Sequence, residues 1–202
     1  AIYGREMAAL QEAGRVRTIP YDPLLKVHTF WDLGWNDETS IIFVQRAASE
    51  IRIIDHISSS FLTLADYVKQ LEGKPYRYGT DFLPHDGNAR SVNTGKSARE
   101  ILEALGRTVS IVPRLDVEEG IAAARMMFPR CYFDEGATGK LIQSLKKYRR
   151  QMHQSTGTFG APLHDDASHD ADAFRYLAVG ESGLSNDDWG GVPINYRNRV
   201  IA

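Results

Sequence analysis

Hydrophobic residues gather in three short, consecutive segments early in the chain. Residues 27–33, 41–47 and 50–57 are rich in β-branched and aromatic side chains, and short polar breaks separate them. Such segments are typical of buried strands joined by tight turns. We therefore predict a three-stranded antiparallel meander over this part of the chain.

Apolar residues at helical spacing follow, and strand-like segments lie between them. The pattern predicts helices over 58–73, 97–107, 117–128, 139–153 and 169–180, strands over 76–85 and 109–114, and a possible hairpin over 155–163. A meander followed by alternating helices and strands indicates an α/β mixed sheet, part antiparallel and part parallel, with helices on both faces. The ribonuclease H-like fold has this order of elements.

The two ends of the chain differ in composition from its centre. Residues 6–13 have helical composition, residues 15–25 contain two prolines, and the chain does not begin with methionine. We expect residues 1–25 to be a linker remnant of a longer protein and residues 26–180 to form one domain. The stretch 181–202 is rich in Gly, Asn and Asp, and we expect a flexible C-terminal tail there.

Composition narrows the possible functions. The chain has 202 residues, 43% of them hydrophobic and 25% charged, and a formal net charge of -2. A surface that binds nucleic acid must therefore be local. The single cysteine, Cys131, excludes a disulfide framework and a cysteine-based zinc site. No apolar run is long enough to cross a bilayer, and no Walker A or GxGxxG motif occurs.

Three acidic places stand out against this pattern. Asp32 lies within the first predicted strand, although a buried carboxylate costs free energy unless it is paired or bound to a metal. Asp81 and Asp86 lie at the end of the strand predicted over 76–85. The third place is the segment HDDASHDADAFRY, which holds His164, Asp165, Asp166, His169, Asp170 and Asp172.

Each of these places also has a purely structural interpretation. Asp32 would then lie on a solvated face, and Asp86 would belong to a turn with Gly87 and Asn88. The Asp/His segment would cap the last helix, whose N-terminus favours negative charge. Either interpretation is open for each place alone, but the predicted element order brings all three together and favours a shared site.

Carboxylates gathered in this way suit phosphodiester hydrolysis. That reaction needs an activated water and stabilisation of a more negative transition state, and two divalent cations about 4 Å apart supply both. Mg²⁺ and Mn²⁺ prefer carboxylate oxygens, and the ions relieve the repulsion between the carboxylates. The sequence therefore predicts a site for two Mg²⁺ or Mn²⁺ ions.

A basic stretch lies in the helix predicted over 139–153. It is either a solvated face, which is the usual meaning of a basic run, or a surface that contacts DNA phosphates, with Tyr148 stacking on a base. The local concentration of charge in a net-acidic domain favours the second interpretation. The residues concerned are Lys140, Lys146, Lys147, Arg149 and Arg150.

Several longer stretches resemble a known family. FWDLGWNDETSI, FLPHDG, GIAAARMMFPRCYFDE and PLHDDASHDADAFRYLAVG are similar to sequences of the C-terminal nuclease domain of the large terminase subunit of tailed double-stranded DNA bacteriophages. The resemblance covers most of residues 26–180. It implies a ribonuclease H-like fold and a metal-dependent endonuclease that cuts concatemeric viral DNA during genome packaging, with little sequence specificity.

The resemblance also implies partners and a location. Double-stranded DNA would be the substrate, and an N-terminal ATPase domain would precede the nuclease in the full-length subunit. The small terminase subunit and the portal would be further partners, in the cytoplasm of the infected host cell. Two other hypotheses are open: another ribonuclease H-like nuclease, such as a junction resolvase, and a non-catalytic DNA-docking module.

The family's acidic residues map onto this chain one by one. The first-strand acid matches Asp32, the acid after the fourth strand matches Asp86, and the acid of the final helix matches Asp172. His169 lies one helical turn before Asp172 and would ligand or orient the second metal. Asp81 is an alternative to Asp86. Asp165 is a further candidate ligand. We interpret Asp166 and Asp170 as additional acids of this segment rather than as ligands.

Overall fold

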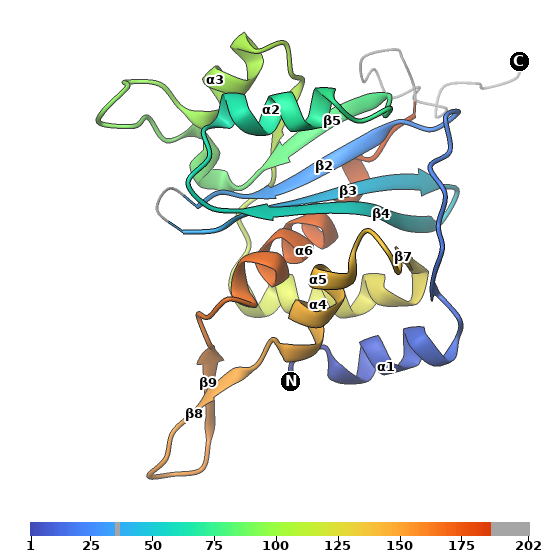
Figure 1. The fold of residues 1–202 in the computed structure, drawn as a ribbon. Coiled ribbons are helices and arrows are strands. Elements are labelled where there is room, and N and C mark those ends of the chain that lie inside the picture. Colours follow the sequence, from blue (N-terminus) through green and yellow to red (C-terminus); the bar gives the residue numbers. More distant parts are fainter. Residues whose placement is uncertain (35–36, 187–202) are drawn as a thin grey trace, which may run out of the picture.

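The computed structural model describes residues 1–34 and 37–186, and a seven-stranded sheet lies at its centre (Figure 1). The strands, in the order β1-β7-β4-β3-β2-β5-β6, are parallel to their neighbours except for β3, which is antiparallel to both β2 and β4. This confirms the predicted mixed sheet. The strands are β1 (Val16–Arg17), β2 (Val27–Asp32), β3 (Thr39–Ala47), β4 (Glu50–Ser59), β5 (Tyr78–Leu83), β6 (Val109–Ile111) and β7 (Cys131–Asp134).

Helices cover both faces of the sheet, as predicted. One face carries α1 (Gly4–Glu12), α4 (Val117–Met127), α5 (Gly139–Lys147) and α6 (Ser168–Gly180), and the other carries α2 (Leu64–Glu72) and α3 (Ala98–Ala104) (Figure 1). Single 3₁₀ turns span His85–Asn88, Phe128–Arg130 and Glu181–Gly183. None of the helices in the described ranges combines the length and the apolar character that a membrane span requires.

Two separate hydrophobic cores result from this layering. Alternation along β2 places Phe30 in the core under α4 and α6, whereas Trp31 enters the core under α2 and α3. Phe30 stacks on Phe82 with ring centroids 4.5 Å apart, and Trp31 meets Tyr67 edge to face. Because both faces are buried, the position of a residue along its strand decides which layer its side chain meets.

The N-terminal residues are part of this domain, whereas the sequence pattern predicted a connecting segment over 1–25. Tyr3 and Met7 on α1 are fully buried in the core under α4 and α6. β1 extends the sheet by pairing with β7, so Val16 lies opposite Phe133. Both strands escaped prediction because two to four residues are too few to show a clear alternation.

The basic helix is shorter than predicted. α5 ends at Lys147 rather than at residue 153, and Tyr148 turns into the core, where it is 2% exposed. A buried ring cannot stack on a base, so that part of the DNA-binding hypothesis is wrong. The following residues form a hairpin of β8 (Arg150–Met152) and β9 (Phe159–Pro162), which agrees with the turn-rich pattern of that segment.

The predicted tail begins later than residue 181. Leu184 is buried in the core, and the Asn186 side chain accepts a hydrogen bond of 3.0 Å from the backbone N–H of Lys26. These contacts attach residues up to 186 to the domain. The rest of the predicted tail, 187–202, lies outside the described residues.

A buried carboxylate fixes α6 against the sheet. Asp170 is fully buried and accepts hydrogen bonds from Ser40 of β3 at 2.7 Å and Ser144 of α5 at 2.6 Å, and it pairs with His56 of β4 at 2.9 Å. Burial opposes its ionisation, but the hydrogen bond and charge of His56, with the two serines, outweigh burial and lower the pKa of Asp170 to about 2.

We predict that Asp170→Asn lowers the free energy of unfolding by about 2–4 kcal/mol at pH 7, because one buried partner of His56 and the serines is lost. A lowered pKa stabilises the fold above the unfolded pKa of 3.8, and this contribution disappears as the pH falls toward 2. Chemical denaturation at pH 7 and at pH 3 measures both effects. The exposed Asp166→Asn is the control, and equal stability of the two variants would contradict the anchoring role.

Candidate active site

Asp32 is the last residue of β2, at the end of the sheet where β2 and the parallel strand β5 finish side by side. It shares a strand face with Phe30, so its side chain points toward α6, and it is 9% exposed. Its Oδ2 lies 2.9 Å from Nδ1 of His169, in the first turn of α6. Asp32 therefore lies where strand β2 ends, next to the first turn of helix α6.

Asp86 and Asp172 reach the same place from two other elements. Asp86 lies in the 3₁₀ turn directly after β5, and Asp172 lies on α6, one turn beyond His169. Both are near enough for their negative charge to raise the pKa of Asp32. The three acids predicted from the sequence are therefore brought together by β2, the turn after β5, and α6.

The electrostatics of this cluster are unfavourable without further positive charge. Burial raises the pKa of Asp32 most, the hydrogen bond from His169 opposes the rise, and the charges of Asp172 and Asp86 add to it. The hydrogen bond that His169 donates to Asp32 in turn raises the pKa of His169. Carboxylates this close together favour the binding of divalent cations, because the ions neutralise the repulsion between the carboxylates.

Asp81 lies on the opposite face of the sheet. Its carboxylate receives two hydrogen bonds from Arg107, at 2.7 and 2.8 Å, and one of 2.6 Å from Thr29. The side chain is 1% exposed, among residues under α2 and α3. Its oxygens are therefore occupied within the fold and face away from Asp32.

The remaining acids of the Asp/His segment have separate positions. Asp170 is the buried residue that fixes α6 against the sheet. Its interpretation as merely an additional acid of the segment did not include this role. Asp165 accepts a hydrogen bond of 3.1 Å from the backbone N–H of Ala167 just before α6, and Asp166 is exposed. The negative charges that raise the pKa of Asp32 include those of Asp172 and Asp86.

Arg175 pairs with one of the acids. It is 8% exposed and donates a hydrogen bond of 2.8 Å to Asp172, three residues before it on α6. Burial opposes its charge, but Asp172 outweighs burial and raises the pKa of Arg175. Its aliphatic stem crosses α4 at Gly120, where an added Cβ would lie 2.5 Å from Cδ of Arg175.

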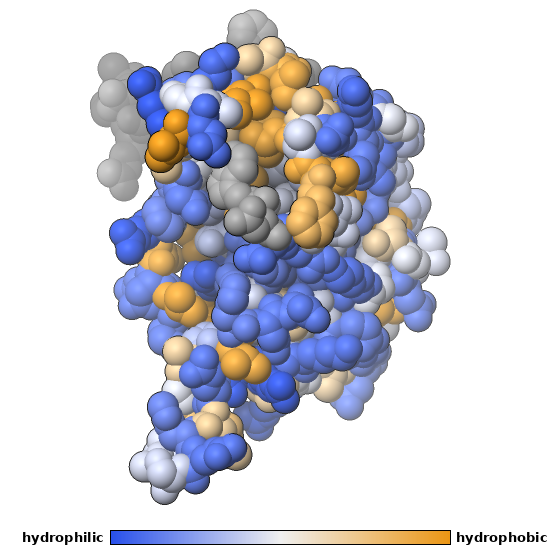
Figure 2. Space-filling model, turned by 60° about the vertical axis from the view of Figure 1, so that its left-hand side comes forward, coloured by the Kyte–Doolittle hydropathy of each residue, from blue (hydrophilic) through white to orange (hydrophobic). Residues whose placement is uncertain are grey.

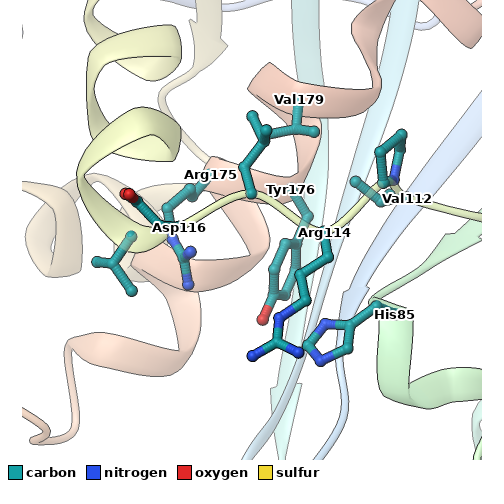
Figure 3. A pocket seen from close by; sticks show the side chains of 10 residues that line it. His85, Val112, Arg114, Asp116, Arg175, Tyr176 and Val179 are labelled. Atoms are coloured by element: carbon teal, nitrogen blue, oxygen red, sulfur yellow. The ribbon is translucent and has the colours of Figure 1, made fainter.

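A cavity of about 550 Å³ opens between the turn after β5, the segment before α4, and α6 (Figure 3). Its walls include His85, which precedes Asp86, and Arg175 and Tyr176 of α6. Arg114 lines it from the segment before α4, and its guanidinium extends to the same side as the imidazole of His85. Arg114 has no hydrogen bond or ion pair with a described residue, so the cavity offers a positive charge without an acidic partner among the described residues.

The five basic residues named from the sequence do not form one helical face. Lys140 forms an ion pair with Glu38, and Arg150, on β8, forms a two-bond pair with Glu118 at 2.5 and 2.6 Å. Lys147 and Arg149 are exposed, and Lys146 is partly exposed. The end of the sheet where β2 finishes is mostly hydrophilic, and the β8–β9 hairpin projects below it (Figure 2).

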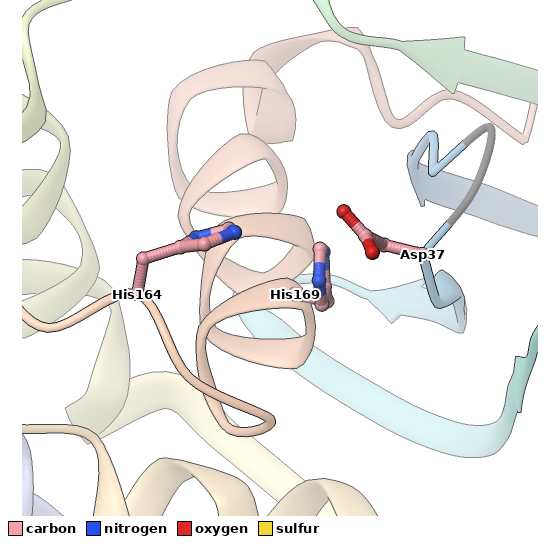
Figure 4. Close-up of side chains that lie close together, drawn as sticks. All are labelled: Asp37, His164 and His169. Atoms are coloured by element: carbon pink, nitrogen blue, oxygen red, sulfur yellow. The ribbon is translucent and has the colours of Figure 1, made fainter.

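Two further residues near the acids can bind metal, and neither was among the metal ligands predicted from the sequence. Asp37, at the start of the segment that leads into β3, and His164, before α6, each place a ligand atom within 4.8 Å of the other and of His169 (Figure 4). Within the described part of the chain, Asp32, Asp86 and Asp172 do not form a group as close as this one. Asp37 escaped notice because it follows a turn-rich stretch, where aspartate is common.

The sheet order and the helices on both faces define a ribonuclease H-like α/β fold. No protein-family model and no curated protein matches the sequence. Solved structures share the fold at low identity, and those described below are large terminases of bacteriophages or their nuclease domains.

The chain matches the phage P22 large terminase nuclease domain with a TM-score of 0.63 and 14% identity, over 86% of this chain and 91% of that one. It matches the g2p nuclease domain of bacteriophage SPP1 with bound Mn with a TM-score of 0.54 and 14% identity, over 79% and 87%. The large terminase of thermophilic bacteriophage D6E gives 0.63 and 14% over 84% of this chain, which spans only 43% of the D6E protein.

We predict that Gly120→Ala lowers the free energy of unfolding by about 1–3 kcal/mol, although alanine is normally the better helix former. The new Cβ would collide with the buried stem of Arg175 and move its guanidinium away from Asp172. Chemical denaturation measures the change. Gly139→Ala on α5 is the control, since no atom lies within 4 Å of its added Cβ. Equal stabilities of the two variants would show that Arg175 can move aside without any loss of stability.

Proposed function

We propose that this chain is a metal-dependent DNA endonuclease domain that cuts concatemeric viral DNA during genome packaging. The observation that carries the proposal is the convergence of Asp32, Asp86 and Asp172 at one end of the sheet. They come from three elements of a fold that large terminase nuclease domains share. A merely solvated acidic surface would not need two carboxylates so near Asp32 that their charge raises its pKa.

The acids are the proposed ligands of two divalent ions, Mg²⁺ or Mn²⁺. Asp32 would contact both ions, with Asp86 and Asp172 each completing one coordination sphere. When bound, the ions supply an activated water and stabilise the leaving 3′ oxygen. Manganese bound to the SPP1 nuclease domain, which has the same fold, supports this choice of metal.

His169 has a supporting part in this proposal. Its Nδ1 lies against Oδ2 of Asp32 at 2.9 Å and leaves the other carboxylate oxygen for a metal. The contact also fixes the orientation of Asp32 at the end of its strand. His169 would in this way position Asp32, and its second nitrogen remains available as a ligand.

DNA would approach along the hydrophilic end of the sheet. Arg114 and His85 line the cavity next to Asp86, while Lys147 and Arg149 stay exposed on the side of the hairpin. Lys140 and Arg150 form ion pairs with Glu38 and Glu118, and these pairs would weaken their contribution to DNA binding. Contacts of this kind reach phosphates rather than base edges, so we propose cleavage with little sequence specificity.

We further propose that the domain acts within a longer large terminase subunit. The match to 43% of the D6E protein leaves room for a further domain there, and that protein was also solved in complex with ADP. An N-terminal ATPase, the small terminase subunit and the portal remain proposed partners. The cytoplasm of the infected host cell is the proposed location.

We predict that Asp32→Asn reduces Mg²⁺- or Mn²⁺-dependent nicking of plasmid DNA by about 10²–10³-fold or more, because the carboxylate that would hold both ions is lost. Gel electrophoresis of supercoiled plasmid measures the nicking. Circular dichroism and thermal unfolding check that the variant stays folded.

The control is Asp166→Asn, an exposed acid of the same segment, which should cut like the unmodified chain. Full activity of Asp32→Asn would contradict the proposal. Preferred cleavage of a four-way junction over linear duplex would favour a resolvase. DNA binding that survives replacement of all three acids, with no Mn²⁺ binding by calorimetry, would favour a docking module.

For DNA binding, we predict that Arg114→Gln weakens affinity several-fold and lowers the slope of log K against log salt by about one, because one phosphate contact is lost. Fluorescence anisotropy with duplex DNA, without divalent ions and at several salt concentrations, measures both. Arg99→Gln on α3 is the matched control, since Arg99 pairs with Glu103 on the other face of the sheet. An unchanged slope for Arg114→Gln would exclude the cavity from the DNA path.

A further inference from the structure

Three side chains that can bind metal converge beside the acids, and two of them, Asp37 and His164, lie outside the carboxylate site proposed above. His169 lies between Asp37 and His164 (Figure 4), and one ligand atom of each lies within 4.8 Å of the others. Asp37 and His164 are exposed, while His169 is partly buried. Groups at this spacing can share one ion, and solvent reaches them directly.

Hydrogen bonds prepare both imidazole rings for such an ion. Nδ1 of His169 faces Oδ2 of Asp32 at 2.9 Å, and Nδ1 of His164 faces the hydroxyl of Ser168 at 3.1 Å. Nε2 of each ring is then the nitrogen without a hydrogen-bond partner among the described residues. A carboxylate behind one nitrogen fixes the tautomer and makes the other a better metal ligand.

The donor set determines which ions fit. Two imidazole nitrogens and one carboxylate suit Zn²⁺, Co²⁺ or Mn²⁺, whereas Mg²⁺ prefers oxygen ligands alone. We propose that Asp37, His164 and His169 form a transition-metal site next to the carboxylate site. Because His169 contacts Asp32, an ion in this site also fixes the position of Asp32. Only this consequence rests on the proposed nuclease function.

Binding of Co²⁺ to the complete chain in excess Mg²⁺ tests the site, because Mg²⁺ occupies carboxylates and leaves imidazoles open. Visible absorption and calorimetry should detect one Co²⁺ ion per chain. His164→Ala and His164→Gln should weaken this binding at least about tenfold, and Asp37→Asn should weaken it as well. His153→Ala, in the β8–β9 hairpin, removes an exposed histidine elsewhere and should leave Co²⁺ binding unchanged.

Unchanged Co²⁺ affinity in both His164 variants would overturn the proposal. So would loss of Co²⁺ binding in Asp86→Asn, because the ion would then occupy the carboxylates. His164→Ala should keep Mg²⁺-dependent nicking of plasmid DNA, since His164 lies outside the three acids. If the nuclease hypothesis fails, Co²⁺ binding still stands, and if the histidine site fails, Mg²⁺-dependent cleavage still stands, so the two failures are distinguishable.

Discussion

The buried carboxylate of Asp170 is the interaction on which the geometry of the candidate site depends. It joins α6 to β3, β4 and α5 through Ser40, His56 and Ser144. Successive residues of a helix point about 100° apart, so fixing Asp170 inward also fixes the direction of its neighbours. His169 and Asp172 are thereby turned toward the end of β2, where Asp32 lies.

Acids at this end of the sheet therefore have opposite roles, Asp170 on α6 and Asp32 on β2. Asp170 is fully paired, and its pKa falls to about 2, whereas the pKa of Asp32 is raised by burial and by nearby negative charge. The first arrangement stabilises the folded chain. The second arrangement, at Asp32, costs free energy that the fold itself does not recover. Binding of cations explains this arrangement better than a contribution to stability does.

Parallel pairing and strand parity explain why particular acids meet. β2 and β5 end at the same edge, so the turn that follows β5 brings Asp86 beside Asp32. Asp81 is still within β5, and its side chain enters the opposite core, where Arg107 binds it. Asp81, an acid in an internal ion pair, and Asp86, an acid in the candidate site, are thus only five positions apart in the sequence.

The amino-acid pattern alone was enough to predict the mixed sheet with helices on both faces, because periods of two and 3.6 residues are properties of local order. It also pointed to Asp32, since a carboxylate in an apolar strand needs a partner. Tertiary structure decided the rest. Neither the anchor at Asp170, the pairing of Arg150 with Glu118, nor the approach of Asp37 to His164 follows from spacing, because each joins residues that only the folded chain brings together.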